Sequence, residues 1–152
     1  MKMWDFLWHM RGSAHLRGEQ SNQEVLDGIE ALLKRQRKPL SKRSSNEVIF
    51  NSPLWQSYLG PNWLAMVVYD HGRIWIDQHT NDRVLRYDLR SLHGFVFCLL
   101  GAVMFFAFGV AVGGLIKGIS YAAFAFGWLY GMNMVLAWAR IPRMIRNAVE
   151  NR

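Results

Sequence analysis

The chain has 152 residues, of which 51% are hydrophobic, and a formal net charge of +7 at pH 7. Its single cysteine excludes an internal disulfide and is consistent with a reducing compartment. We interpret the positive charge as a complement to anionic lipid headgroups, because the sequence has no separate basic fold of the kind that reads nucleic acid. Nucleic acid is therefore not an expected partner.

Residues 1–20 are predicted to form an interfacial and connecting segment. Trp4 and Trp8 stand beside cationic residues, a mixture typical of a segment at the headgroup level of a membrane. The alternative is that these aromatic side chains pack on the protein's own domain. Asp5 argues against a cleavable signal peptide, and the polar stretch from Gly12 to Gln20 is expected to be a connector.

A cytoplasmic α+β domain is expected over residues 21–90. Ser21 and Glu24 form a capping-box pattern, so an amphipathic helix should begin there, and Pro39 should stop it. Its apolar positions recur with helical spacing and are Val25, Leu26, Ile29, Leu32 and Leu33.

A basic run extends from Lys34 to Arg43, across the end of this helix and a linker predicted over residues 39–46. Cations at the end of a helix agree with its dipole. The run either contacts anionic lipid or forms a solvated face, and the second is the commoner outcome for such runs.

Four β-rich runs follow, over residues 47–50, 63–69, 73–77 and 83–88. Turns at His71-Gly72 and Thr80-Asn81 would join the last three runs as an antiparallel meander. The registers that these turns set pair Tyr69 and Val67 with Ile74 and Ile76, and Ile76 and Ile74 with Leu85 and Tyr87. We therefore expect a three- to four-stranded meander with one apolar face, which the amphipathic helix covers.

The opposite face of the predicted sheet carries Arg73, Trp75 and Arg86. Arg86 should lie where its guanidinium stacks on the indole of Trp75. We expect these three residues to bind a partner.

Residues 91–139 contain two long apolar runs, expected as a transmembrane helical hairpin over about 92–116 and 118–139 with a turn at Lys117. Each run exceeds the roughly 20 residues that cross a bilayer. A buried hairpin in a soluble core is disfavoured, because the rest of the chain is too small to cover two helices that are apolar all round. Cationic residues flank both runs, so the positive-inside rule places both termini in the cytoplasm and the hairpin in the inner (plasma) membrane.

Small residues recur at four-residue spacing in both runs, and they are Gly109 and Gly113, then Ala123, Gly127 and Gly131. Such rows allow helices to approach closely in lipid. The two rows are expected to pack on each other, with the helices of a partner as the alternative. Asn133 is expected to form an interhelical hydrogen bond, with a functional site as the alternative.

Residues 140–152 are predicted to form a basic amphipathic tail at the membrane surface. Arg140, Arg143 and Arg146 would stay within reach of lipid phosphates. Pro142 would occupy the first turn of this short helix. The apolar stripe that would enter the interface consists of Ile141, Met144, Ile145, Ala148 and Val149.

Residues with potential chemistry are few. Several gather at the two predicted turns of the meander, namely Asp70, His71, Asp77, His79 and Asp82. Those turns lie about five residues, or roughly 17 Å, apart along the middle strand, which is too far for one metal ion. The sequence contains no phosphate-binding glycine loop, nucleophile elbow or paired cysteine motif. We therefore expect no catalytic residue, metal or cofactor.

The sequence as a whole predicts a small, non-enzymatic integral membrane protein that serves as an accessory or interaction subunit of a larger membrane complex. Its partners would be a bilayer with anionic headgroups and either another membrane protein or further copies of the chain. One alternative is a protective protein of the immunity type, which counters a toxin acting at the membrane. Another is a holin-like lesion former, against which the predicted folded domain counts.

Overall fold

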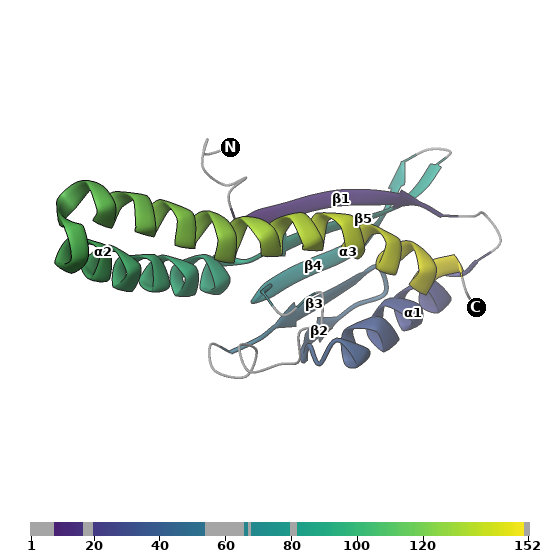
Figure 1. Ribbon diagram of the computed structural model, residues 1–152. Helices are drawn as coiled ribbons and strands as arrows, with labels where there is room; N and C mark the ends of the chain where they lie inside the picture. Colours follow the sequence, from purple (N-terminus) through teal and green to yellow (C-terminus); the bar gives the residue numbers. More distant parts are fainter. Residues whose placement is uncertain (1–7, 17–19, 54–65, 67, 80–81, 151–152) are drawn as a thin grey trace.

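The computed structural model describes residues 8–16, 20–53, 66, 68–79 and 82–150. The elements in chain order are strand β1 (His9–His15), helix α1 (Asn22–Arg35), strands β2 (Leu40–Arg43), β3 (Glu47–Asn51), β4 (His71–His79) and β5 (Asp82–Arg90), helix α2 (Leu92–Phe126), the π-helical turn η2 (Gly127–Gly131) and helix α3 (Met132–Glu150). Figure 1 shows a sheet with helices packed against it and a long helical projection that extends beyond the sheet.

The five strands form one antiparallel sheet in the order β1-β5-β4-β3-β2. Strands β4 and β5 pair Ile76 with Leu85 and Ile74 with Tyr87, which confirms the register predicted from a turn at Thr80-Asn81. The short strand predicted over residues 47–50 is also confirmed, as β3. Alternation along the strands gathers the apolar side chains on one face, where they are at most 5% exposed; they are Val48, Phe50, Ile74, Ile76, Leu85, Tyr87 and Leu89.

The prediction that residues 63–69 and 73–77 form the first hairpin of the meander is wrong. Tyr69 lies just before β4 and outside any strand, and Ile74 pairs with Val48 of β3 on that side. Residues 63–65 and Val67 lie outside the described residues. The turn residues His71 and Gly72 belong to β4 itself, where Phe50 and Leu89 side chains cover Gly72 and a Cβ would come within 2.2 Å of Phe50.

The prediction of a connector from Gly12 to Gln20 is wrong for its first residues, because residues 9–15 form β1. This strand lies at the edge of the sheet, along β5. The core face of this strand carries Met10, Gly12 and Ala14, so it lacks the regular large side chains by which a strand is recognised. Gly12 lies under the ring of Tyr87, where a Cβ would come within 2.1 Å of the phenol oxygen. A small residue at this position therefore makes room for the large one on the neighbouring strand.

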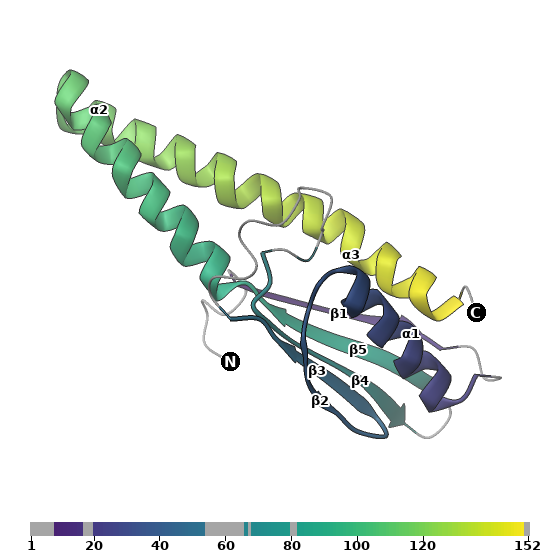
Figure 2. The same ribbon diagram turned by 90° about the horizontal axis from the view of Figure 1, so that it is seen from below.

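Helix α1 begins as predicted. The Oγ of Ser21 accepts a hydrogen bond from the N–H of Glu24 at 3.2 Å, and the Glu24 carboxylate accepts one from the N–H of Ser21 at 2.7 Å. The hydrogen bonds that the Glu24 carboxylate accepts from the backbone N–H and the hydroxyl of Ser21 lower the pKa of Glu24. The predicted apolar stripe is buried against the sheet, from Val25 to Leu33. Figure 2 shows this helix and the second half of α3 lying over the same face of the sheet.

Residues 92–150 form one helical run that is long and apolar enough to be a candidate membrane span, and its most apolar window is only 17% buried. Helix α2 is a single helix by its bounds, but its backbone departs from helical geometry at Gly113 and at Gly114, whose φ is 83°. The chain reverses there (Figures 1 and 2), so that the rings of Phe108 and Tyr121 stack with centroids 6.3 Å apart. The predicted division into two separate helices joined at Lys117 is not confirmed, because the bend comes earlier and lies inside α2. We call residues 92–136 the helical arm.

Helix α3 runs without interruption from the helical arm into the core of the domain. Ile141 and Ile145 are completely buried, together with side chains of the sheet and of α1. The prediction of a separate surface tail over residues 140–152 is therefore wrong, although its apolar stripe was identified correctly, because the stripe packs on the sheet. Pro142 lies inside α3 and not in the first turn of a new helix.

Candidate functional site

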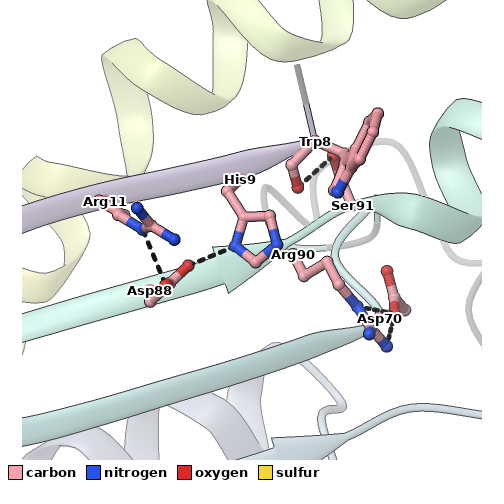
Figure 3. Close-up of polar contacts among 7 residues, drawn as sticks. All are labelled: Trp8, His9, Arg11, Asp70, Asp88, Arg90 and Ser91. Carbon is pink, nitrogen blue, oxygen red and sulfur yellow. Dashed lines mark hydrogen bonds and ion pairs between the residues drawn. The ribbon is translucent and has the colours of Figure 1, made fainter. Parts of the chain in front are cut away.

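A cluster of buried polar groups joins the end of the sheet to the start of α2 (Figure 3). Asp70 is 3% exposed, and its Oδ2 accepts hydrogen bonds from Nε and Nη2 of Arg90 at 3.0 and 2.8 Å. Its Oδ1 accepts a longer bond, 3.3 Å, from the backbone N–H of His93 in the first turn of α2. The N-cap residue Ser91 makes no side-chain capping bond. Asp70 thus supplies, from outside the helix, the acceptor and negative charge that a helix N-terminus favours.

Ser91 connects three parts of the chain. Its N–H donates to the carbonyl of Trp8 at 2.7 Å, just before β1, and its Oγ lies 3.1 Å from the phenol oxygen of Tyr130. Tyr130 belongs to η2, and π-helical turns are frequent at functional positions. The returning helix is therefore tied to the point where β5 becomes α2.

Aromatic rings surround the contacts of Asp70, Arg90 and Ser91 between β5 and α2, which we call the junction. Phe95 packs edge-on against Trp8, Phe126 and Tyr130, with ring centroids 5.8, 5.5 and 5.3 Å apart. Trp8, which was predicted to lie at the membrane surface, is thus held by the protein's own helical arm, and its contact with lipid stays a prediction. Trp4, predicted for the same surface, lies outside the described residues.

Lys38 is buried beside this junction, with only 4% of its surface exposed. Its Nζ donates a hydrogen bond to the carbonyl of Tyr69 at 2.7 Å. Burial lowers the pKa of Lys38 to about 8, although the nearby Asp70 carboxylate acts in the opposite direction. Burial also raises the pKa of Tyr69. Lys38 thus joins the segment after α1 to the segment before β4.

The open face of the sheet, opposite the helices, carries paired charges around a shallow hollow of about 730 Å³ over β1, β5 and β4. Asp88 pairs with His9 at 2.7 Å and with Arg11 at 2.8 Å (Figure 3), and Arg86 pairs with Asp77 at 3.0 Å. Among the described side chains, Asp77 and Asp88 on this face are thus each paired with a side chain of a neighbouring strand.

The three residues predicted to bind a partner lie on this open face. The guanidinium over the Trp75 ring is that of Arg73, at 5.0 Å from the ring centroid. The predicted stacking of Arg86 on Trp75 is therefore wrong: Arg86 is the cross-strand neighbour of Trp75 but turns to Asp77. Arg73 also pairs with Glu47 at 2.8 Å, and hydrogen bonds from Lys42 and Arg73 lower the pKa of Glu47.

The small residues of the helical arm separate into two groups. Gly109 lies where the two limbs of the arm touch, since a Cβ there would come within 2.8 Å of the Cα of Gly118, and Gly113 lies at the bend. The second row faces outward instead: Ala123 is exposed, and, beyond the surrounding helical backbone, no atom of a described residue lies within 4 Å of a Cβ built at Gly127 or Gly131. The two predicted rows therefore do not pack on each other.

Asn133 does not form the predicted interhelical bond. It is exposed, and its Nδ2 donates to the carbonyl of Leu129, one turn earlier in the same helical run, at 2.6 Å. The three tail arginines, Arg140, Arg143 and Arg146, are exposed along the outer side of α3. No ion pair joins them to any residue that the structure describes.

Sequence patterns missed the residues of the junction. Asp70 stood out only as a weak metal candidate, and Lys38 belonged to a basic run of ordinary appearance. Within the described ranges, no group of three or more His, Cys, Asp or Glu side chains is placed to hold a metal ion. Neither a protein-family model nor a curated protein matches this chain.

Proposed function

We propose that this chain is a small, non-enzymatic membrane protein whose helical arm crosses the bilayer twice and whose domain serves as an accessory or interaction subunit of a larger membrane complex. One observation carries the membrane part of the proposal. Apart from Leu40, every large hydrophobic side chain that is exposed in the described part of the chain lies between Val96 and Trp138. An apolar surface of this extent marks a membrane or protein interaction site.

The dimensions and charges of the arm support two crossings with both ends on the same side. Each limb, before and after the bend at Gly114, offers roughly the 20 helical residues that span the hydrocarbon core. Lys117 is the only charged residue near the bend, whereas Arg90 and Arg140 flank the base of the arm. By the positive-inside rule the base and the domain lie in the cytoplasm. The membrane that the arm crosses is then the inner (plasma) membrane, which borders the cytoplasm.

Two exposed surfaces support the interaction part of the proposal. The row Ala123, Gly127 and Gly131 faces away from the arm's own contacts, as a row that receives a partner's helix would. On the domain, Trp75 is half-buried on the open face, with Arg73 over its ring. Aromatic and arginine side chains are enriched where protein partners bind.

The proposal is tested by affinity isolation of the tagged full-length protein from its native membrane in mild detergent, followed by mass spectrometry. We expect a reproducible set of membrane proteins to stay bound to the wild type. Trp75→Ala and Gly127→Leu should each reduce their recovery at least several-fold, while Asn147→Ala, on the exposed side of α3, should not. Recovery of the wild-type protein alone, as a monomer, would contradict the accessory role.

A further inference from the structure

Apart from Lys117 at the bend of the arm and Arg140, Arg143 and Arg146 of α3, the cations of the described residues fall into two groups. Those on and beside the sheet are engaged: Arg11, Lys42, Arg43, Arg73, Arg86 and Arg90 form ion pairs, and Arg83 and Lys38 donate hydrogen bonds. Lys34, Arg35 and Arg37, at the end of α1, are exposed and form no ion pair with a residue that the structure describes.

The acidic residues of α1 do not compensate these charges. Glu24 is engaged in the capping box at the other end of the helix. Asp27 and Glu30 both pair with Arg43 of β2. The last turn of α1, with Lys34 and Arg35, and Arg37 just after the C-cap therefore present a concentrated positive charge.

Arg37 has a backbone conformation that an arginine rarely adopts. Its φ is 55°, in the left-handed region. It occupies the position after the C-cap in a Schellman motif, in which the N–H of Lys38 bonds to the Leu33 carbonyl at 2.9 Å and the N–H of Arg37 to the Lys34 carbonyl at 3.0 Å. Glycine is the usual residue there, because it has no Cβ to strain. The helix dipole accounts for cations at Lys34 and Arg35, but Arg37 lies beyond the helix and carries its charge against the local backbone preference.

This charged end of α1 lies on the side of the domain from which the helical arm departs. Lys38, next to Arg37, bonds to the carbonyl of Tyr69, and the adjacent Asp70 contacts the first turn of α2. Figure 2 shows α1 running from beside the C-terminal end of α3 towards the side of the arm. Once the arm is inserted, these cations would face the headgroup layer.

We propose that Lys34, Arg35 and Arg37 form a binding surface for the phosphate groups of anionic phospholipids. The inference rests on the membrane insertion proposed above, which holds the surface at headgroup level. Guanidinium groups bind phosphate oxygens through charge-assisted and often bidentate hydrogen bonds. Several cations beside a membrane together give a preference for anionic over zwitterionic lipid on the order of tenfold or more.

The test is native mass spectrometry of the full-length protein in mild detergent, with equal amounts of phosphatidylglycerol and phosphatidylcholine. We expect the wild type to retain phosphatidylglycerol on the order of tenfold better. Lys34→Gln with Arg37→Gln should remove most of this preference. The matched control, Arg11→Gln with Lys42→Gln, loses the same charges from the sheet and should keep the preference. An unchanged preference in the first variant would overturn the proposal.

A second variant separates lipid binding from folding. Arg37→Gly should raise the melting temperature by relieving the backbone while lowering the retention of phosphatidylglycerol, two changes that a merely structural arginine would not combine. Full competition by inorganic phosphate at the concentration of the lipid would show a site for free anions and overturn the lipid assignment. Alkaline extraction of native membranes is done first. A wild type that washes off contradicts the insertion itself, whereas one that stays without lipid preference contradicts this inference alone.

Discussion

Asp70 and Arg90 form an ion pair in which two guanidinium nitrogens contact one carboxylate oxygen, at 3.0 and 2.8 Å, while the other oxygen caps helix α2. Arg90 is the last residue of β5, and α2 begins at Leu92. The pair therefore fixes the helical arm to the sheet where the arm leaves. The returning limb is fixed as well, because α3 ends within the domain core. Sheet and arm thus form one continuous body with no flexible linker at either end.

Asp70→Asn should lower the free energy of unfolding by about 2 kcal/mol, because it removes the charge that pairs with Arg90 and caps α2. The loss should not be larger, since the Arg90 side chain is 36% exposed and water replaces part of the interaction. Thermal unfolding of the purified protein in mild detergent measures the change. Asp77→Asn is the control, because its partner Arg86 is 52% exposed, and it should cost less than about 1 kcal/mol. Equal losses in the two variants would show that the junction has no special role.

Gly28→Ala should destabilise the protein by about 1–3 kcal/mol, although alanine is the better helix former. A Cβ at Gly28 would come within 2.4 Å of the backbone carbonyl oxygen of Ala148, so α1 and α3 would have to separate. Gly127→Ala is the matched control, since, beyond the surrounding helical backbone, no atom of a described residue lies within 4 Å of a Cβ built there, and it should be neutral or stabilising. Melting temperatures that move in the same direction would contradict the close approach of the two helices.

Gly114→Ala should destabilise the reversal of the arm. The φ of 83° and ψ of −177° at Gly114 belong to a region that only glycine adopts readily, so we expect a cost of roughly 1–3 kcal/mol. Gly113→Ala should cost less, because its φ of −165° is extended and the nearest atoms to its Cβ would be those of the flexible side chain of Lys117. The melting temperatures of the two variants provide the comparison. A greater loss for Gly113→Ala would place the strained residue elsewhere.

Because burial lowers the pKa of Lys38, we expect the stability of the protein to depend on pH. Its pKa is about 8 in the folded protein and near 10.5 in the unfolded chain, so the folded state binds fewer protons between these values. The free energy of unfolding therefore increases as pH rises from 8 to 10, by up to about 2 kcal/mol. Lys38→Met removes the titrating group, and its stability relative to the wild type should fall over this range. Melting temperatures of both proteins at pH 7 to 10 test this, and a constant difference would contradict it.

The sequence identifies local features well where a strong local pattern exists. The capping box of Ser21 and Glu24, the apolar stripe of α1 and the register of Ile76 with Leu85 are all confirmed, because each depends on residues that are near one another along the chain. Strand β1 was not predicted, because its core face includes the small residues Gly12 and Ala14, which are not typical of a strand. Gly12 makes room for Tyr87 of the neighbouring strand, and the sequence does not show that contact.

Long-range packing could not be predicted from the same patterns. The stripe of Ile141 and Ile145 fits a membrane surface as well as a sheet, and only the return of α3 over the sheet decides between them. The junction is of the same kind: Lys38, Asp70 and Ser91 are distant in sequence, and their polar side chains gave no sign that all three are buried. The cations at the C-terminal end of α1 and the row of Ala123, Gly127 and Gly131 are of the same kind: the sequence did not show on which side of the domain or of the arm they lie.

Two crossings of the bilayer by the helical arm are tested most directly by the side of the membrane on which each part of the chain lies. In a Cys98→Ser background, single cysteines at Ser45, Lys117 and Asn147 are labelled with a membrane-impermeant maleimide in intact cells and in inverted vesicles. If the arm crosses the bilayer twice, Lys117→Cys reacts in intact cells, whereas Ser45→Cys and Asn147→Cys react only in inverted vesicles. Labelling of Lys117→Cys on the same side as the other two would show that the arm does not cross the bilayer.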